Sequence, residues 1–248
     1  NYLTVRELPP FFDHKYRIRY YKSEYKNSLD DIEHPSVKAC LEFLKIEKGI
    51  ELVHTGDVPA MSGVGSSSAF TVGLLHSLYA LSGQFVTKRK LAYEAIDIEQ
   101  NIIGEHVGSQ DQVAAAFGGF NIIEFFKDDR IIVQPLTLRS SRIQALEDSL
   151  VLFFTGISRT ASEIAETQIN NTPHKIKELD KMKDMVDQAV QILCEESTPL
   201  DEFGLLLNES WKIKRSMSNK ISTDLIDSVY DRGINAGALG GKLLGAGG

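Results

Sequence analysis

A loop rich in glycine and serine, PAMSGVGSSSA at Pro59–Ala69, is the part of the sequence best suited to holding an anion. Gly63 and Gly65 permit main-chain conformations that other residues resist, and they let a ligand approach the backbone closely. Ser66–Ser68 stand where an apolar helix is expected to begin, and the free N–H groups and dipole of a helix N-terminus favour an anion. Serine is also a common N-cap residue, so a plain turn before a capped helix is the alternative.

Two carboxylates further along the chain could complete the chemistry of phosphoryl transfer. That reaction needs a phosphate cradle, a metal ion held by oxygen ligands, and a carboxylate that orients or deprotonates the attacking hydroxyl. Ser67 and Glu99 are candidate Mg²⁺ ligands, and Asp111, in the segment GSQDQ, is the candidate base. A solvated surface charge at Glu99 and a helix-capping role for Asp111 are the alternatives, and spacing alone does not show that these residues meet.

The composition excludes several classes of function. The 248 residues are 42% hydrophobic and carry a net charge of −7, with no basic stripe of the kind that nucleic-acid binders show. No apolar run approaches the roughly 20 residues of a membrane helix, so we expect no membrane partner. Cys40 and Cys194 lack metal-ligand spacing and are expected to be two buried thiols in the cytoplasm. Because the sequence starts at Asn1 and stops in a glycine run, we expect missing residues at both ends.

The elements that must position these residues change in character along the chain. The first part reads as mixed helix and strand, with strands at 16–21 and 49–55, a hairpin at 121–126 and 131–136, and helices at 34–44, 70–81, 88–103 and 110–117. A buried strand is expected at Ser149–Phe154, and helical patterns then dominate, at 158–170, 174–195, 200–216 and 223–236. The pattern predicts two domains, residues 1–145 and residues 146–248.

Three segments, in this order, resemble the GHMP kinases, the family of galactokinase, homoserine kinase, mevalonate kinase and phosphomevalonate kinase. PAMSGVGSSSA resembles the second family signature, GSQDQVAAAFGG looks like the segment that carries the catalytic aspartate, and GGKLLGAGG looks like the start of the third signature. ELPPFFDHKYRIRY, LFFTGISRTASEIA and ESWKIKRSMSNKIS are similar to segments of the bacterial D-glycero-D-manno-heptose 7-phosphate kinases and related sugar kinases. The first family signature is absent and the third is cut short.

The resemblance implies an α+β, two-domain GHMP kinase fold. The first domain, which binds ATP, would be ribosomal protein S5 domain 2-like with a left-handed β-α-β unit. The second would be a helix-rich, ferredoxin-like domain that is incomplete at its end.

The resemblance also implies roles for individual residues. Asp111 would be the catalytic base, and Ser67 and Glu99 would bind Mg²⁺. The residues expected to hold ATP are Pro59, Ser62, Gly63, Val64, Gly65, Ser66, Ser67 and Ser68. The residues expected on the substrate side are Gly108, Gln110, Arg159, Lys214, Arg215, Gly245, Ala246 and Gly247. The three cations in that set are candidates for a sugar phosphate on their charge, and solvated surface cations are the alternative.

The sequence therefore predicts an ATP- and Mg²⁺-dependent sugar kinase acting on C1 of D-glycero-D-manno-heptose 7-phosphate. Galactose, fucose or a mevalonate-like alcohol are alternative acceptors. A catalytically silent GHMP-fold protein that binds a sugar or nucleotide is a third possibility, and the joint presence of Asp111, Glu99 and Ser67 speaks against it. A homodimer is left open.

Overall fold

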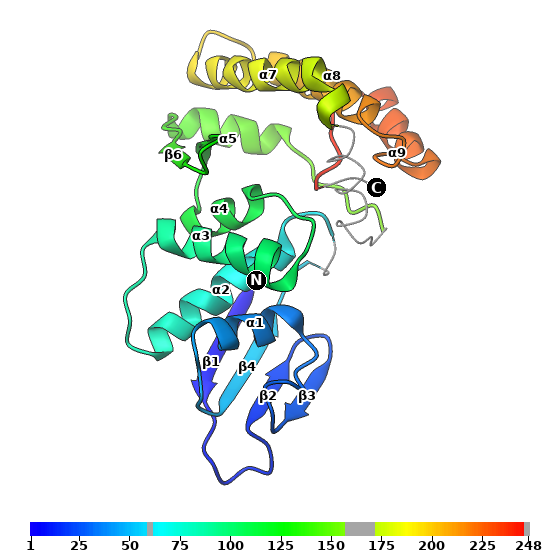
Figure 1. Cartoon of the computed structure of the whole chain (residues 1–248). Helices are drawn as coiled ribbons and strands as arrows, with labels where there is room; N and C mark the ends of the chain where they lie inside the picture. The colour runs from blue at the N-terminus through cyan, green and yellow to red at the C-terminus, as the bar shows by residue number, and fades with distance from the viewer. Residues whose placement is uncertain (59–61, 157–171, 246–248) are drawn as a thin grey trace. The chain divides into compact units, whose positions relative to one another are not determined.

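The computed structural model describes residues 1–58, 62–156 and 172–245, which form helices and two sheets (Figure 1). The chain divides into two compact units, Asn1–Pro135 and Leu136–Gly248. The boundary expected at 145–146 falls inside helix α5 (Ser140–Ser149), so the observed division comes before this helix. The expected α+β, two-domain organisation is confirmed.

A four-stranded sheet forms the base of the first unit, with the strand order β1-β4-β2-β3. Its strands are β1 (Tyr2–Glu7), β2 (Tyr16–Arg19), β3 (Ser23–Lys26) and β4 (Ile50–Thr55). β2 and β4 are parallel, and helix α1 (Pro35–Phe43) lies between them in the chain, which makes a β-α-β unit. The other two pairings are antiparallel.

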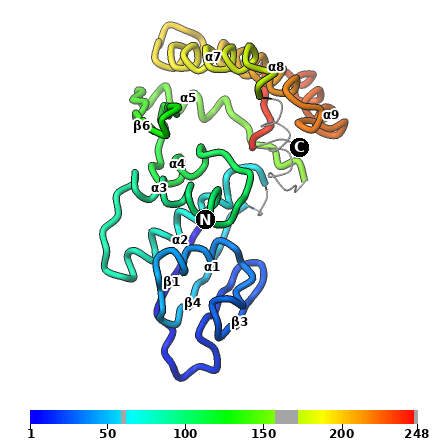
Figure 2. The backbone as a smooth tube through the Cα atoms, viewed as in Figure 1, coloured from blue at the N-terminus to red at the C-terminus, as the bar shows by residue number. Residues whose placement is uncertain are grey.

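The apolar side chains of this sheet pack with helices into one large core. Ile18, Ile50 and Leu52 are buried against α1 and α2 (Ser66–Leu81). Three further helical elements follow, α3 (Lys88–Asp97), a π-helix (Ile98–Ile103) and α4 (Gln110–Phe117), and then the hairpin of β5 (Asn121–Phe125) and β6 (Ile131–Pro135). α3 and α4 lie side by side (Figure 2). α4 also packs against α2.

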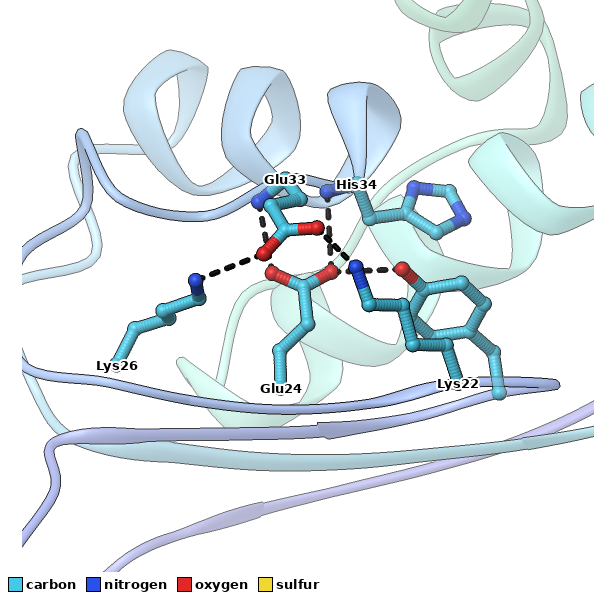
Figure 3. Close-up of polar contacts among 6 residues, drawn as sticks. Lys22, Glu24, Lys26, Glu33 and His34 are labelled. Atoms are coloured by element: carbon cyan, nitrogen blue, oxygen red, sulfur yellow. Dashed lines mark hydrogen bonds and ion pairs between the residues drawn. The ribbon is translucent and has the colours of Figure 1, made fainter.

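Glu24 on β3 ties the small β2–β3 hairpin to the N-terminus of α1 (Figure 3). The carboxylate is buried and accepts hydrogen bonds from the backbone N–H groups of Glu33 (2.7 Å) and His34 (3.1 Å). It also accepts one from the Tyr20 hydroxyl at 2.8 Å. Glu24 thereby supplies acceptors for the two amides that immediately precede α1 and fixes the chain where it enters the helix.

The second unit is built from helices around a smaller core. After α5 come a 3₁₀ turn (Thr172–His174), α7 (Ile176–Cys194), α8 (Asp201–Ser216) and α9 (Asp224–Asn235). α7 and α8 lie side by side (Figure 2). The buried residues of this core are Trp211, Met217, Ile221 and Ile226.

The strand expected at Ser149–Phe154 is wrong. Residues 150–154 have no regular secondary structure, and Val151 and Phe153 are 76% and 73% exposed. No strand occurs at 136–156 or 172–245, so the sheet of a ferredoxin-like domain has no paired strand within these ranges. An apolar run becomes a strand only when a neighbouring strand satisfies its N–H and C=O groups, and periodicity cannot supply that neighbour. The helix expected at 158–170 lies outside the described residues.

Both cysteines are free thiols, and only one matches the expectation of burial. Cys40 lies in the core of the first unit, whereas Cys194, at the end of α7, is exposed. None of the helices in the described ranges is both long enough and apolar enough to cross a membrane.

Candidate active site

The glycine–serine loop leads into α2 through two left-handed residues. Gly63 and Gly65 have φ angles of 76° and 69°, which confirms the need for glycine at both positions. α2 begins at Ser66 rather than at Phe70, and its N-cap residue is Gly65, not a serine. Gly65 offers no side chain to cap the helix, so the N–H groups of Ser66–Ser68 point out of the first turn as donors for an anion.

Glu99, on the π-helix, is a buried carboxylate next to this first turn. Its side chain belongs to a residue only 1% exposed, and Oε2 accepts a hydrogen bond from the Ser68 hydroxyl at 2.8 Å. The side-chain amide of Gln112 donates to the same oxygen. Oε1 is buried and has no hydrogen-bond partner among the described residues. A buried carboxylate oxygen without a donor is costly, and a cation would compensate it.

The structure pairs Glu99 with Ser68, whereas sequence reasoning paired it with Ser67. Ser67 accepts a hydrogen bond at its main-chain oxygen from Thr71, and its hydroxyl is not among the contacts of Glu99 within the described ranges. Ser68 was expected only as part of the loop, and Gln112 was missed. Helical phase does not distinguish the two serines, because Ser68 is in phase with Val72, Leu75 and Tyr79 and Ser67 with Thr71, Leu74 and Leu78, and all six of these in-phase residues are buried.

Asp111, in the first turn of α4, lies directly against the start of α2. A Cβ atom added to Gly65 would stand 3.0 Å from Cγ of Asp111, so the carboxyl group occupies the space beside this glycine. Although part of Asp111 is exposed, desolvation raises the pKa of its carboxyl group above the ordinary value. A carboxylate with a raised pKa is a better proton acceptor near neutral pH.

The π-helix also organises the segment between Glu99 and Asp111. The Gln100 side-chain amide donates to the main-chain oxygen of Val107 at 2.9 Å and to the hydroxyl of Ser109 at 3.2 Å. The Glu105 amide donates to the Glu99 main-chain oxygen at 2.9 Å, and burial together with the charge of Glu99 raises the pKa of the Glu105 carboxyl group. These contacts fix the chain that leads to α4.

Gly108 and Gln110, both expected on the substrate side, are exposed on either side of Ser109. In the loop, Val64 is exposed, and the hydroxyl of Ser62 is buried with no partner in the described part of the chain. The expected site residues Pro59, Arg159, Ala246 and Gly247 lie outside the described residues.

The cations assigned to the substrate in the second unit have protein partners. Lys214 Nζ donates to the main-chain oxygens of Leu243 at 2.9 Å and Gly245 at 2.6 Å. Arg215 forms an ion pair with Asp227 at 2.7 Å. Burial, and to a smaller extent the charge of Lys242, lowers the pKa of Lys214 to about 8. These partners make Lys214 and Arg215 parts of the local structure of the second unit.

Comparisons with known proteins find kinases that are similar to this chain. Residues 35–119 match the family described as the GHMP kinases N terminal domain. The chain is 34% identical over 209 residues to the D-glycero-alpha-D-manno-heptose 7-phosphate kinase of Campylobacter jejuni, covering 83% of this chain and 61% of that protein. It is 24% identical to the mevalonate kinase of Pyrococcus horikoshii, over 92% of this chain and 67% of that protein.

Solved structures show the same fold. The crystal structure of a D-glycero-D-manno-heptose 1-phosphate kinase from Bacteroides thetaiotaomicron matches with a TM-score of 0.73 and 28% identity, over 99% of this chain and 73% of that one. A mevalonate kinase structure matches with a TM-score of 0.68 and 19% identity. The chain therefore carries a segment, residues 35–119, that matches the GHMP kinases N terminal domain, and it shares the fold of the solved kinases. It is similar to the heptose phosphate kinase of Campylobacter jejuni, of which it spans 61%.

Proposed function

We propose that the protein carrying this chain transfers the γ-phosphoryl group of ATP to a hydroxyl group of a sugar or sugar phosphate. The preferred acceptor in this proposal is the C1 oxygen of D-glycero-D-manno-heptose 7-phosphate, because the Campylobacter jejuni protein that is 34% identical to this chain is a heptose 7-phosphate kinase. The observation that carries the proposal is the start of α2, where Asp111 lies against Gly65 and Ser68 is bonded to Glu99.

The residues around the start of α2 divide the work of phosphoryl transfer. The N–H groups of Ser66–Ser68, with the helix dipole, bind the negatively charged phosphates. Asp111 accepts the proton of the acceptor hydroxyl while the hydroxyl oxygen forms a bond to the γ-phosphorus. The bond from that phosphorus to the ADP oxygen breaks in the same step. The raised pKa of Asp111 suits this role because the carboxylate must hold the proton it receives.

Magnesium fits the donors next to this helix start. Glu99 Oε1 is a buried carboxylate oxygen without a partner in the described chain, and the Ser68 hydroxyl contacts the other oxygen of the same carboxylate. The described residues contain no group of three or more His, Cys, Asp or Glu side chains that could hold a metal ion. Mg²⁺ does not require such a group, since it keeps several waters and binds through one or two carboxylates and the substrate phosphates. Glu99 and Ser67 would hold the ion, which neutralises charge on the phosphates.

The remaining assignments belong to the same proposal. Gly108 and Gln110 precede Asp111 in sequence and would contact the acceptor, as would Arg159, Arg215 and Gly245–Gly247. Pro59 and Ser62–Gly65 would complete the wrapping of the triphosphate. A cytoplasmic location follows from the need for ATP and a sugar phosphate, and a homodimer stays a prediction.

The decisive test measures ADP release and ATP binding in Asp111→Asn. Because the amide cannot accept the proton, we expect turnover to fall about 10²- to 10⁴-fold while calorimetry shows unchanged affinity for ATP and Mg²⁺. Asp128→Asn is the matched control, since this exposed carboxylate pairs only with Arg130 on the hairpin among its described neighbours. Turnover within twofold of wild type in Asp111→Asn would remove the base assignment.

A panel of acceptors tests the substrate in the same assay. Heptose 7-phosphate should give the highest kcat/KM among heptose 7-phosphate, galactose, fucose and mevalonate. Turnover confined to one of the other three would overturn the preferred acceptor. Binding of ATP and sugar without ADP release would identify a silent binding protein.

A further inference from the structure

The glycine-rich segment at the end of the second unit lies along helix α8. Between residues 239 and 245, the described chain has no main-chain hydrogen bond of its own. Its conformation therefore depends on what α8 offers it. Three contacts with α8 are present, and they occur in the same order along the segment and along the helix.

The first contact is a close approach between two glycines. A Cβ atom added to Gly240 would stand 2.1 Å from the main-chain oxygen of Gly204 and 2.7 Å from the amide nitrogen of Asn208. A Cβ atom on Gly204 would stand 2.9 Å from Cβ of Leu239. Side chains at either position would push the segment away, so the two glycines bring its main chain onto the helix surface.

The second and third contacts come from lysines. Lys242 Nζ donates to the hydroxyl of Ser210 at 3.3 Å. Lys214 Nζ donates to the main-chain oxygens of Leu243 and Gly245, at 2.9 and 2.6 Å. From residue 204 to residue 214 a helix advances roughly 15 Å. Residues 240 to 245 span roughly 16 Å when extended. The two lengths agree, so the segment is long enough to follow α8 over this stretch, and among the described contacts the last is made by Lys214.

We propose that Lys214 is a positioning residue that fixes the main chain at Leu243–Gly245 and thereby orients the glycine-rich segment Gly240–Gly245. The functional meaning rests on the proposed kinase activity, in which this segment contacts the acceptor. Lys214 then acts through the main chain and not as a direct ligand of the sugar phosphate.

The burial and the hydrogen bonding of Lys214 support this role. A partly buried ammonium group needs acceptors, and the two carbonyl oxygens supply them. The depressed pKa of Lys214, about 8, reflects its removal from water and the nearby charge of Lys242. Arg215, its neighbour in sequence, is paired with Asp227 and does not compete for these oxygens.

Trypsin provides a direct readout, because Lys242 lies within the segment. In the complete protein that carries this sequence, cleavage after Lys242 requires the segment to leave α8. We expect Lys214→Met to speed this cleavage at least about tenfold, because the variant loses two hydrogen bonds made by a charged donor. Lys212→Met is the matched control, since Lys212 is exposed on the same helix and pairs with Glu209, and its cleavage rate should match wild type.

Lys214→Arg separates anchoring from folding. Arginine retains donors for two carbonyl oxygens, so cleavage after Lys242 should return to within about threefold of the wild-type rate. Equal rates in wild type and Lys214→Met would overturn the proposal. If Lys214→Met is cleaved faster throughout the second unit, for example after Arg232 in α9, Lys214→Arg decides. Fast cleavage after Lys242 in a folded Lys214→Arg protein would also overturn it.

Kinetics then test whether the anchor serves the proposed activity. We expect Lys214→Met to raise KM for the sugar phosphate severalfold and to leave KM for ATP unchanged. Absence of phosphoryl transfer in the wild-type protein would overturn the proposed function, while the trypsin result would still decide the anchoring role. Unchanged kinetics together with faster cleavage would remove its link to the acceptor.

Discussion

The two units hold their candidate site residues in different ways. In the first, Glu99 and Gln112 are fixed by burial in a large core, and Ser68 reaches them from the first turn of a well-packed helix. In the second, a small core around Trp211 supports α8, and Lys214 holds the main chain of a segment without secondary structure. The first unit is thus fixed by packing, and the second by a few individual contacts. Substitutions in the first unit should therefore change turnover, whereas substitutions in the second unit should change how readily its glycine-rich segment leaves α8.

After Asp111, the largest expected effect comes from Glu99. Glu99→Gln keeps an acceptor oxygen for Ser68 and Gln112 but loses the charge that would bind a metal ion, so the Mg²⁺ requirement should rise and turnover should fall about 10²-fold or more. Glu99→Ala additionally leaves two buried donors unpaired, so the free energy of unfolding should fall by about 2–4 kcal/mol. Magnesium titration of ADP release and urea denaturation measure the two effects.

These two variants separate binding from packing at one position. The glutamine variant should unfold within about 1 kcal/mol of wild type, since shape and acceptor are retained. An unchanged Mg²⁺ titration in Glu99→Gln would show that this carboxylate does not bind the metal ion.

The next effect is at Gly65, where the left-handed conformation and the contact with Asp111 coincide. Gly65→Ala should lower turnover by about 10- to 100-fold, because a Cβ atom there would displace the Asp111 carboxyl group. Gly83→Ala is a matched control at the other end of α2, with φ of 66° and no atom within 4 Å of an added Cβ. Both variants should be destabilised by about 1–2 kcal/mol. Equal turnover in both would separate Asp111 from the reaction.

A smaller effect is the pH dependence of the second unit. Because the pKa of Lys214 is about 8 in the folded protein against an ordinary 10.5, the unfolded chain binds more protons between these values. The stability contribution of Lys214 should therefore rise with pH from about 8 to about 10.5 and stay level on either side. Denaturation of wild type and Lys214→Met across this range measures it, and a difference that does not vary with pH would contradict the depressed pKa.

The smallest effect is expected in the exposed segment at residues 150–154. Val151→Thr should change the free energy of unfolding by less than about 0.5 kcal/mol, because Val151 is largely in water. Val72→Thr, on the buried face of α2, should cost about 1–3 kcal/mol, because a hydroxyl enters the core. If Val151→Thr lowers the free energy of unfolding of the complete protein by more than about 1 kcal/mol, other residues bury this segment there. The second unit would then depend on packing more than its small core suggests.

Local chemistry allowed much of the site to be predicted. Glycine at positions 63 and 65 indicated left-handed backbone, and the structure has it at both. The periodicity at 110–117 indicated the helix that carries Asp111, and the observed bounds of α4 are the same. Such features depend on residues close together in sequence, which is why a single sequence reveals them.

Features that depend on distant partners were harder to predict. Ser68 rather than Ser67 contacts Glu99 because the packing of α2 fixes its rotation, which the identities of three consecutive serines do not encode. Edge strands β1 and β3 mix charged and apolar residues, so their patterns are weak until the central strands are placed. At residues 150–154 the pattern is strong, yet no partner strand exists in the described chain.

The π-helix at Ile98–Ile103 makes the site sensitive to chain length in a way that substitutions would not reveal. A π-turn holds one more residue than an α-turn, so it amounts to a single-residue insertion in an otherwise regular helix. Deleting any one residue there would restore the α-helical repeat and rotate everything that follows by about 100°. Gly104 to Asp111 would turn with it, although every side chain in that stretch would be unchanged. The register between Glu99 and Asp111 is therefore a property of residue number, and related sequences that differ by one residue in this helix would build a different site.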